Sequence, residues 1–350
     1  MILRTISFFL AIVLTPVAYG QDNALWEQYK TNFISQDGRV VDYYQGLISH
    51  SEGQGYGMNL SVKFGDRPTF EKIWQWTKNN LQVRADHLSA WQWGQRPNRE
   101  WSIIDYNNAT DGDILIAYAL LKADEKWHDK DYKASALKII QDIRTHLSIT
   151  WHERTFLLPG YSGFDKENGF VVNPSHVILP AFRAFAKEDQ KTFWEKIYND
   201  GLFLLERSCF GAFCLPADWM FVTDGKISVY AGRDPYYGSD AIRILLHLSS
   251  EKTLPYPKGI RKILDIYQKT GYLPLWTDLD KDSVSLQPAP AGYYAVYALS
   301  AKRRGDEALS KKLLKEAREK LKDDKKAYYS FSLYLLATDE DGRQESAAGI

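Results

Sequence analysis

Three carboxylates in this sequence share a local setting that suits acid–base chemistry. Each follows a serine or a threonine at the expected start of a helix, and the pairs are Ser51-Glu52, Thr110-Asp111 and Ser239-Asp240. Two carboxyl groups can divide the work of general acid–base catalysis, because one donates a proton while the other, ionised, activates water. A third acid could anchor a substrate beside them. The sequence therefore predicts one site built from all three.

The first acid lies in an unusual stretch of backbone. Glu52 is followed by glycines at 53, 55 and 57 in the run Ser51-Glu52-Gly53-Gln54-Gly55-Tyr56-Gly57-Met58, which has helical text on both sides. Each glycine inside a helix costs roughly 0.5–1 kcal/mol relative to alanine. We therefore expect something to approach this backbone closely. Local rules tend to fail in this way at functional sites.

Each acid also has a simpler explanation. Acids stabilise helix N-termini through the helix dipole, and Ser or Thr is a favoured N-cap. Asp113 could complete a capping box with Thr110, and Asp240 could pair with Arg243 at i, i+3. Together, however, the three helix starts could converge at one end of an all-helical toroid in which alternate helices point the same way. Cleavage of a glycosidic bond needs such a set of acids.

The elements that must position these acids are mostly helical. Apolar residues recur at i, i+3 and i+4 in many segments, at 70–81, 114–121, 134–143, 242–246, 260–267, 293–299, 308–321 and 328–336. Strand-like alternation is rare and short, as at 226–230, and two long loops are expected at 85–108 and 157–173. We predict an all-α fold of about ten to twelve helices. Residues 21–338 would form a single domain, followed by a disordered tail at 339–350.

Composition excludes several classes of partner. The 350 residues carry a formal net charge of zero, so neither nucleic acid nor a membrane surface is indicated. Aromatic residues are abundant at 14%. Many of them must form the core, but Trp and Tyr in excess also suit a cleft that stacks flat ligands such as sugar rings.

The N-terminus is typical of a secretory signal peptide. A basic Arg4 precedes a mostly apolar run over 6–17, and Ala18-Tyr19-Gly20 forms a small-x-small cleavage site. The apolar run is shorter than the ~20 residues that a membrane span needs. We expect residues 1–20 to be removed and the mature protein to be periplasmic or secreted.

The cysteines leave two alternatives open. Cys209 and Cys214 could pair in an oxidising compartment or remain buried thiols. Two cysteines make half of a structural zinc site, and the seven histidines show no partner spacing. No metal and no cofactor are expected.

Two long motifs resemble those of glycoside hydrolase family 8. The run 51–58 resembles the acid motif of that family, and Ala109-Thr110-Asp111-Gly112-Asp113 with the helix after it resembles its signature helix. Asp240-Ala241-Ile242-Arg243 resembles the segment of its general base. Shorter matches follow in order along the chain, at 34–40, 90–94, Leu158-Pro159-Gly160, Asn173-Pro174-Ser175, Pro216-Ala217-Asp218-Trp219 and Ala327-Tyr328-Tyr329. The resemblance covers nearly the whole mature chain and is strongest to the periplasmic endoglucanases of bacterial cellulose-synthesis operons.

The resemblance implies a fold and roles for the acids. The fold would be an (α/α)6 barrel. Glu52 would protonate the glycosidic oxygen, Asp240 would activate water on the opposite face of the sugar, and Asp111 would bind and distort the sugar between them. Arg243 would orient a carboxylate. Because the helix dipole lowers a carboxyl pKa, Glu52 would need burial or a nearby anion, such as Asp111, to remain protonated. Inversion would require ~6.5–9.5 Å between acid and base.

Aromatic residues of the same motifs are candidates for sugar binding. Tyr56, Trp91, Trp93 and Trp219 could stack on or contact sugar rings, although core packing would explain each of them equally well. The chain departs from the family in having His176 after Asn-Pro-Ser and Ser239 before the base, where relatives usually carry tyrosine. Both residues are expected near the cleft and bear on substrate preference.

The resemblance therefore predicts an inverting endo-β-1,4-glucanase acting on cellulose. A xylanase or chitosanase of the same family is the alternative within the class. A secreted glycan-binding subunit without turnover is the alternative outside it, and its acid or base would be missing. The cellulose synthase export complex is a possible partner that the resemblance suggests.

Overall fold

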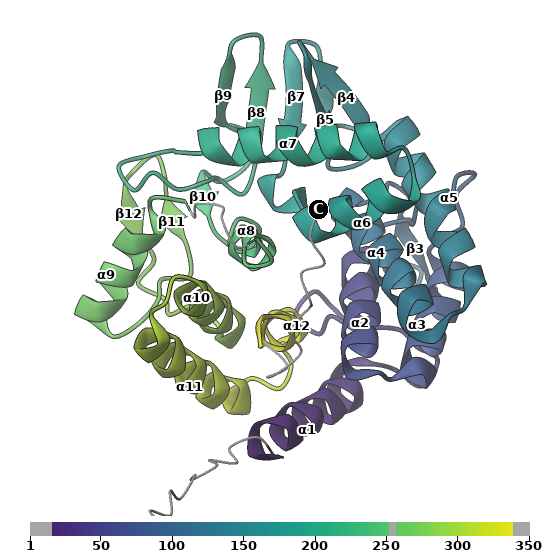
Figure 1. Ribbon diagram of the computed structural model, residues 1–350, viewed down its shortest axis with the longest axis horizontal. Coiled ribbons are helices and arrows are strands. Elements are labelled where there is room, and N and C mark those ends of the chain that lie inside the picture. The colour runs from purple at the N-terminus through teal and green to yellow at the C-terminus, as the bar shows by residue number, and fades with distance from the viewer. Residues whose placement is uncertain (1–15, 252–256, 339–350) are drawn as a thin grey trace, which may run out of the picture.

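Two concentric rings of helices make up the protein (Figure 1), seen in a computed structural model that describes residues 16–251 and 257–338. The inner ring is α2 (Ser51–Phe64), α4 (Thr110–Trp127), α6 (Leu179–Glu188), α8 (Arg243–Leu248), α10 (Ala291–Arg303) and α12 (Tyr328–Ala337). Each inner helix contacts the next, and α12 contacts α2, so that the ring closes. The outer ring is α1 (Pro16–Phe33), α3 (Arg67–Asn80), α5 (Lys130–His146), α7 (Lys191–Arg207), α9 (Ile260–Thr270) and α11 (Glu307–Asp323). This arrangement is an (α/α)6 barrel, as the resemblance implied.

The first fifteen residues of the expected leader and the whole of the expected tail at 339–350 lie outside the described residues. Within the two described ranges, no helix is both long enough and apolar enough to cross a membrane.

The outer helices follow ordinary amphipathic rules. Helix α3 begins after Asp66, whose carboxylate accepts a hydrogen bond from the Thr69 N–H at 3.1 Å, and Pro68 occupies its first turn. Phe70, Ile73 and Trp74 on one side are buried, while the opposite side is exposed. Periodicity predicted α3, α5, α9 and α11 for this reason. It missed α1, α6 and α7.

Within the described residues, short antiparallel strands lie in the connections between helices. They form four small sheets: β1 (Ser49–His50), β2 (Gln92–Gln95) and β3 (Trp101–Asp105); β4 (Ser148–Trp151) and β5 (Arg154–Leu157); β6 (Asp165–Lys166), β7 (Gly169–Val172), β8 (Met220–Thr223) and β9 (Lys226–Val229); β10 (Tyr236–Tyr237), β11 (Thr277–Asp278) and β12 (Ser283–Val284). A single 3-10 turn, η1, spans Pro174–His176. The strand expected at 226–230 is present as β9. The segments 85–108 and 157–173 were wrongly expected to be loops throughout, because strands this short leave little alternation to read.

The glycines beside Glu52 allow helix α4 to approach α2. A Cβ on Gly55 would lie 2.6 Å from the Cβ of Leu115, and a Cβ on Gly112 would lie 2.2 Å from Ser51 Oγ. Real side chains do not tolerate such distances. Bare backbone on both helices therefore lets their N-terminal ends lie side by side, and those ends carry Glu52 and Asp111.

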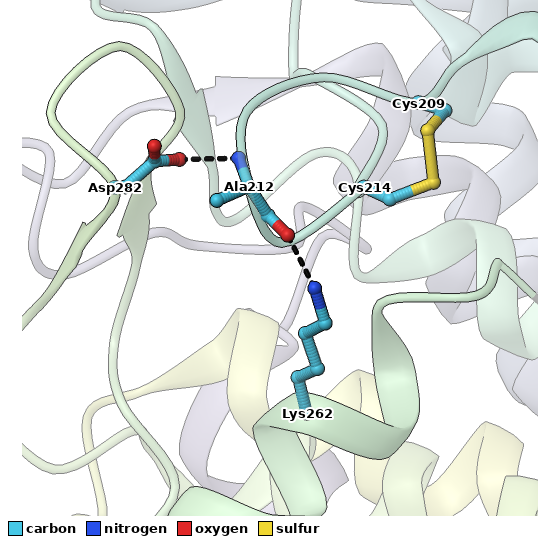
Figure 2. Close-up of a disulfide and its surroundings, with 5 residues drawn as sticks. All are labelled: Cys209, Ala212, Cys214, Lys262 and Asp282. Carbon is cyan, nitrogen blue, oxygen red and sulfur yellow. Dashed lines mark hydrogen bonds between the residues drawn. A yellow bond between two sulfur atoms is a disulfide. The ribbon is translucent and has the colours of Figure 1, made fainter.

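The two cysteines form a disulfide, which resolves the alternatives left open by the sequence. Figure 2 shows the loop closed by Cys209 and Cys214 held on two sides at Ala212. The Ala212 N–H donates to Asp282 Oδ1 at 2.5 Å, and the Ala212 carbonyl accepts from the Lys262 ammonium. The loop thereby ties the chain before β8 to α9 and to the β11–β12 connection.

Asp113 does not complete a capping box. Thr110 donates its hydroxyl hydrogen to the Leu158 carbonyl at 2.6 Å. Asp113 accepts from the Ser89 N–H at 2.8 Å and from the Asn108 amide at 3.0 Å, so it fastens the long segment between α3 and α4 to the barrel. Burial raises the pKa of Asp113 to about 7, against the opposing effect of these hydrogen bonds.

This raised pKa predicts a pH-dependent stability. A carboxyl whose pKa is near 7 when folded and near 4 when unfolded stabilises the fold fully below pH ~4, and that stabilisation is lost as pH rises through 7. Asp113→Asn should reduce the fall in unfolding free energy between pH 4.5 and 7.5 by roughly 2–4 kcal/mol. Urea unfolding at the two pH values measures the difference. The exposed Asp131→Asn on α5 is the control, and an equal fall in wild type and Asp113→Asn would contradict the assignment.

Candidate active site

The three carboxylates predicted from sequence meet in one cleft. It has a volume of about 500 Å³ and lies where the N-terminal ends of α2 and α4 face the turn before α8. Glu52, Asp111 and Asp240 all line it, and so does Arg243. Residues that are 188 positions apart in the chain, from 52 to 240, are thus brought to one surface.

Arg243 binds all three acids. The residue is only 2% exposed. Nη1 forms an ion pair with Glu52 Oε2 and lies 2.7 Å from Asp111 Oδ2, while Nη2 lies 2.8 Å from Asp240 Oδ1. The planar fork of an arginine suits this role, because it offers several donors in fixed directions. The i, i+3 pair of Asp240 with Arg243 is therefore real, but it is part of a larger cluster.

The N-cap predictions for the three hydroxyl residues were wrong. Helix α2 is capped by His50, whose Nδ1 accepts from the Gly53 N–H at 3.1 Å, and Ser51 already lies inside the helix. Helix α4 begins after Ala109, and no side chain caps it. Asp240 lies in a turn, with α8 beginning only at Arg243. The tight contact between α2 and α4 leaves no room for the serine to adopt a capping conformation, since Ser51 Oγ faces Gly112.

Glu52 is held ready to donate a proton. Its pKa is raised to about 7 by burial and by the neighbouring Asp111 and Asp240, against the lowering effects of Arg243 and His50. The cause is thus mainly desolvation, with nearby anions second. A carboxyl in this condition is substantially protonated at neutral pH, as a general acid must be.

Asp111 is held in the ionised state. Burial would raise its pKa, but His176 and Arg243 outweigh this effect and lower it well below the usual range. His176 Nε2 lies 3.4 Å from Asp111 Oδ2. Burial lowers the pKa of His176 itself, so its charge acts on Asp111 only in acid, and at pH 7 Arg243 is the cation beside Asp111.

Asp240 is fixed by Arg243, as predicted, and by two residues to which sequence reasoning gave no role. Its Oδ2 accepts from the Asn173 amide at 3.0 Å, while Oδ1 accepts from Arg243. Beneath it, Asp218 Oδ1 accepts from the N–H groups of Gly238 and Ala241 at 2.9 and 2.7 Å, on both sides of the turn that carries Asp240. Burial, followed by the charge of Asp240, raises the pKa of Asp218 to about 7.

The aromatic and histidine candidates divide into two groups. Trp91, Trp219 and His176 line the cleft. Trp219 stacks on Phe164 with ring centroids 5.9 Å apart and planes within 8°. Their positions suit contacts with a flat sugar ring.

Tyr56 and Trp93 do not line the cleft. Tyr56 is buried one helical turn below Glu52, with its hydroxyl 3.4 Å from Arg243 Nη1. Trp93 packs against Trp76 and Trp101 instead. Gln92 pairs with Asp105 and Trp93 pairs with Ile103, so the extra residue at this register shift is Ile104 in β3. In this structure both side chains contact other protein groups outside the cleft, and their contacts with a sugar stay a prediction.

Four residues of the site were not assigned from sequence. Asn173, Asp218 and Tyr328 belong to motifs that resemble the family, but the sequence analysis gave these three residues no role. Tyr328 donates from its hydroxyl to Glu52 Oε1 at 3.2 Å. For His50, nothing in the sequence indicated a role except its position directly before Ser51.

Comparison with known proteins agrees with this geometry. The family Glycosyl hydrolases family 8 matches residues 5–343. An endoglucanase of Cellulomonas uda is 40% identical over 240 residues, which are 68% of this chain and 66% of that protein. A probable endoglucanase of Novacetimonas hansenii is 34% identical over 277 residues, or 77% of this chain and 80% of that protein. The crystal structure of endoglucanase Cel10 from Klebsiella pneumoniae superposes with a TM-score of 0.79 at 33% identity, covering 90% of this chain and 97% of that one. The family match spans nearly the whole chain, and the protein belongs to glycosyl hydrolases family 8.

Proposed function

We propose that this protein is an endo-acting, inverting β-1,4-glucanase whose substrate is cellulose. The observation that carries the proposal is the cluster at the cleft floor, where three carboxylates from separate parts of the chain contact the single guanidinium of Arg243. The names of the relatives support a glucan as the substrate.

The proposed mechanism assigns one task to each acid. Glu52, protonated near neutral pH, donates to the glycosidic oxygen as the bond breaks. Asp240, oriented by Asn173 and Arg243, removes a proton from the water that attacks the sugar from the other face. Asp111 stays ionised and accepts hydrogen bonds from the sugar next to the scissile bond, with His176 beside it. The product is released with its anomeric configuration inverted.

We also propose the cellular setting that the sequence indicates. Residues 1–20 act as a signal peptide, residues 21–338 form one catalytic domain, and the mature enzyme works in the periplasm or outside the cell. Its operation beside a cellulose synthase export complex would fit the resemblance to the endoglucanases of cellulose-synthesis operons. Immunoblotting of cell fractions, with N-terminal sequencing of the mature protein, tests the location and the cleavage site.

A product profile tests the choice of substrate. Cello-, xylo- and chito-oligosaccharides of equal length should be compared by chromatography of early products. We expect internal cleavage of cello-oligosaccharides at a rate at least tenfold above the others, since about 1.4 kcal/mol of differential transition-state binding suffices for that ratio. Faster cleavage of the xylo- or chito-series would identify a xylanase or chitosanase instead. Binding of any series without cleavage would indicate a glycan-binding subunit.

Glu52→Gln should abolish hydrolysis and leave binding intact. Loss of leaving-group protonation should lower kcat by ~10²–10⁴-fold, while the dissociation constant of cellohexaose, from calorimetry, should change little. Glu71→Gln, an exposed acid on α3, is the matched control. Turnover of the Glu52 variant close to that of wild type would remove Glu52 from the acid role.

Asp240→Asn should be similarly inactive, and the wild-type enzyme should release the α-anomer first. Proton NMR of the earliest product from a β-1,4-glucan measures the anomeric ratio before mutarotation. Inversion follows from direct attack of water activated by Asp240. A β-anomer as first product would contradict the water-mediated mechanism.

Asp111→Asn separates a structural role from a catalytic one. The variant should fold with an unchanged melting temperature, because Asn can still accept from the Gly112 N–H as Asp111 Oδ1 does. We expect kcat to fall roughly 10- to 1000-fold, since a contact to the distorted sugar is lost. The alkaline limb of the pH–rate profile should move to lower pH, because removing the anion lowers the pKa of Glu52. If melting, kcat and pH profile all stay unchanged, Asp111 has no part in the chemistry.

A further inference from the structure

His50 connects the start of helix α2 to the acid of the site. Its Nδ1 accepts a hydrogen bond from the Gly53 N–H at 3.1 Å, which satisfies one of the free amides at the helix N-terminus. A ring nitrogen that accepts from an amide carries no hydrogen. The proton of the neutral imidazole must therefore be on Nε2.

The Nε2–H has a defined acceptor. It lies 2.9 Å from the hydroxyl oxygen of Tyr328, on helix α12. Since His50 is the donor in this contact, Tyr328 accepts there and its own hydroxyl hydrogen is free to point elsewhere. Glu52 Oε1 lies 3.2 Å from the same hydroxyl and takes that hydrogen. The result is a directed chain from the Gly53 amide through His50 and Tyr328 to Glu52.

The surroundings keep the chain in place. His50 and Tyr328 are 6% and 4% exposed, so water cannot readily replace either partner. Asp42 Oδ2 lies 3.7 Å from His50 Nε2 and favours the same tautomer, while its carboxylate is further held by the N–H groups of Tyr44 and Gln45. The charged and titratable groups around Glu52 are Arg243, Asp111 and Asp240, with Tyr56 and Tyr329 nearby.

We propose that His50 is a positioning residue for the general acid, which orients the Tyr328 hydroxyl as a donor to Glu52 Oε1. This inference rests on the proposed acid role of Glu52. Arg243 donates to Oε2 and Tyr328 to Oε1, so both oxygens of the carboxyl are fixed. When Glu52 gives up its proton, both donors stabilise the carboxylate that forms. The histidine thus does two jobs: it caps the helix that carries the acid, and it prepares the acid for proton transfer.

Two substitutions separate these jobs. His50→Asn places a side-chain oxygen near the position of Nδ1, and Asn is a strong N-cap, but it does not reach Tyr328. His50→Gln carries an amide nitrogen far enough to reach Tyr328 but gives up the short capping geometry. We expect His50→Asn to lower kcat roughly 10- to 100-fold with KM and melting temperature nearly unchanged, as for loss of a hydrogen bond to a charged group. We expect His50→Gln to keep kcat within about threefold and to lower the melting temperature by a few degrees.

A double-mutant cycle tests whether His50 acts through Tyr328. Tyr328→Phe removes the hydroxyl, so His50→Asn should cause no further loss of kcat in that background. Losses that multiply in the double variant would overturn the proposal. The alkaline limb of the pH–rate profile should move to higher pH in either single variant, because a hydrogen bond that favours the ionised form of Glu52 is lost. An unmoved limb in both variants would also overturn it.

A measurement without substrate distinguishes this inference from the proposed function. Nitrogen-15 NMR of the wild-type protein should show the His50 ring protonated at Nε2 and not at Nδ1. Carbon-13 NMR of labelled glutamate should show Glu52 titrating at higher pH in His50→Asn than in wild type. If both hold while no glycan is hydrolysed, the proposed function fails and the hydrogen-bond chain stands. Protonation at Nδ1, or an unchanged Glu52 titration, would refute the chain whatever the enzyme cleaves.

Discussion

A single buried cation faces three carboxylates, and the organisation of the site depends on that imbalance. Arg243 can neutralise one negative charge in full, yet Glu52, Asp111 and Asp240 all contact it. Two unit charges 4 Å apart interact by about 4 kcal/mol at an effective dielectric constant of 20, so three ionised acids around one arginine would repel one another strongly. The least costly arrangement keeps one acid protonated. Both Glu52 and Asp111 are buried, but the charges of His176 and Arg243 lower the pKa of Asp111, whereas the pKa of Glu52 is raised to about 7, so Glu52 is the acid that stays protonated.

The barrel is what makes such crowding possible. Helices α2 and α4 approach closely only because Gly55 and Gly112 have no side chains at the contact. The helical stability that these glycines give up is offset by burial of the inner helices, which pack on neighbours all round. Proximity of the two helix starts then follows from geometry, since alternate helices of the toroid point the same way and their N-terminal ends lie on one face. The site is thus a consequence of how the inner ring packs.

Sequence reasoning identified the acids and Arg243, but not the other residues that hold the acids. Periodicity found most amphipathic helices, and the glycine run beside Glu52 correctly signalled a close approach, though the approaching group is helix α4. The N-caps were predicted from hydroxyl residues, and all three were wrong because a capping side chain must be free to turn back on its own helix. Ser51 instead faces Gly112, and Thr110 bonds to Leu158.

Contacts between residues that are far apart in the chain could not be predicted from local sequence patterns either. Asn173 meets Asp240 across 67 positions of chain, and Tyr328 meets Glu52 across 276. No local pattern encodes such pairs, since the residues are ordinary in their own surroundings and gain a role only when the ring closes.

Glu52 and Asp240 are held in different ways, and this difference supports the proposed roles of acid and base. Glu52 lies within a buried helix and is gripped on both oxygens by Arg243 and Tyr328, so its carboxyl presents one constant orientation to the cleft. Asp240 lies on a turn, more exposed than Glu52, and that turn is held from below by Asp218. A base that must meet a mobile water needs access to solvent, whereas an acid that must meet one oxygen of a bound chain needs a fixed direction. If the roles were exchanged, the buried Glu52, with its raised pKa, would have to activate water, and the more exposed Asp240 would have to protonate the leaving oxygen. Both tasks would then fall to the less suitable group.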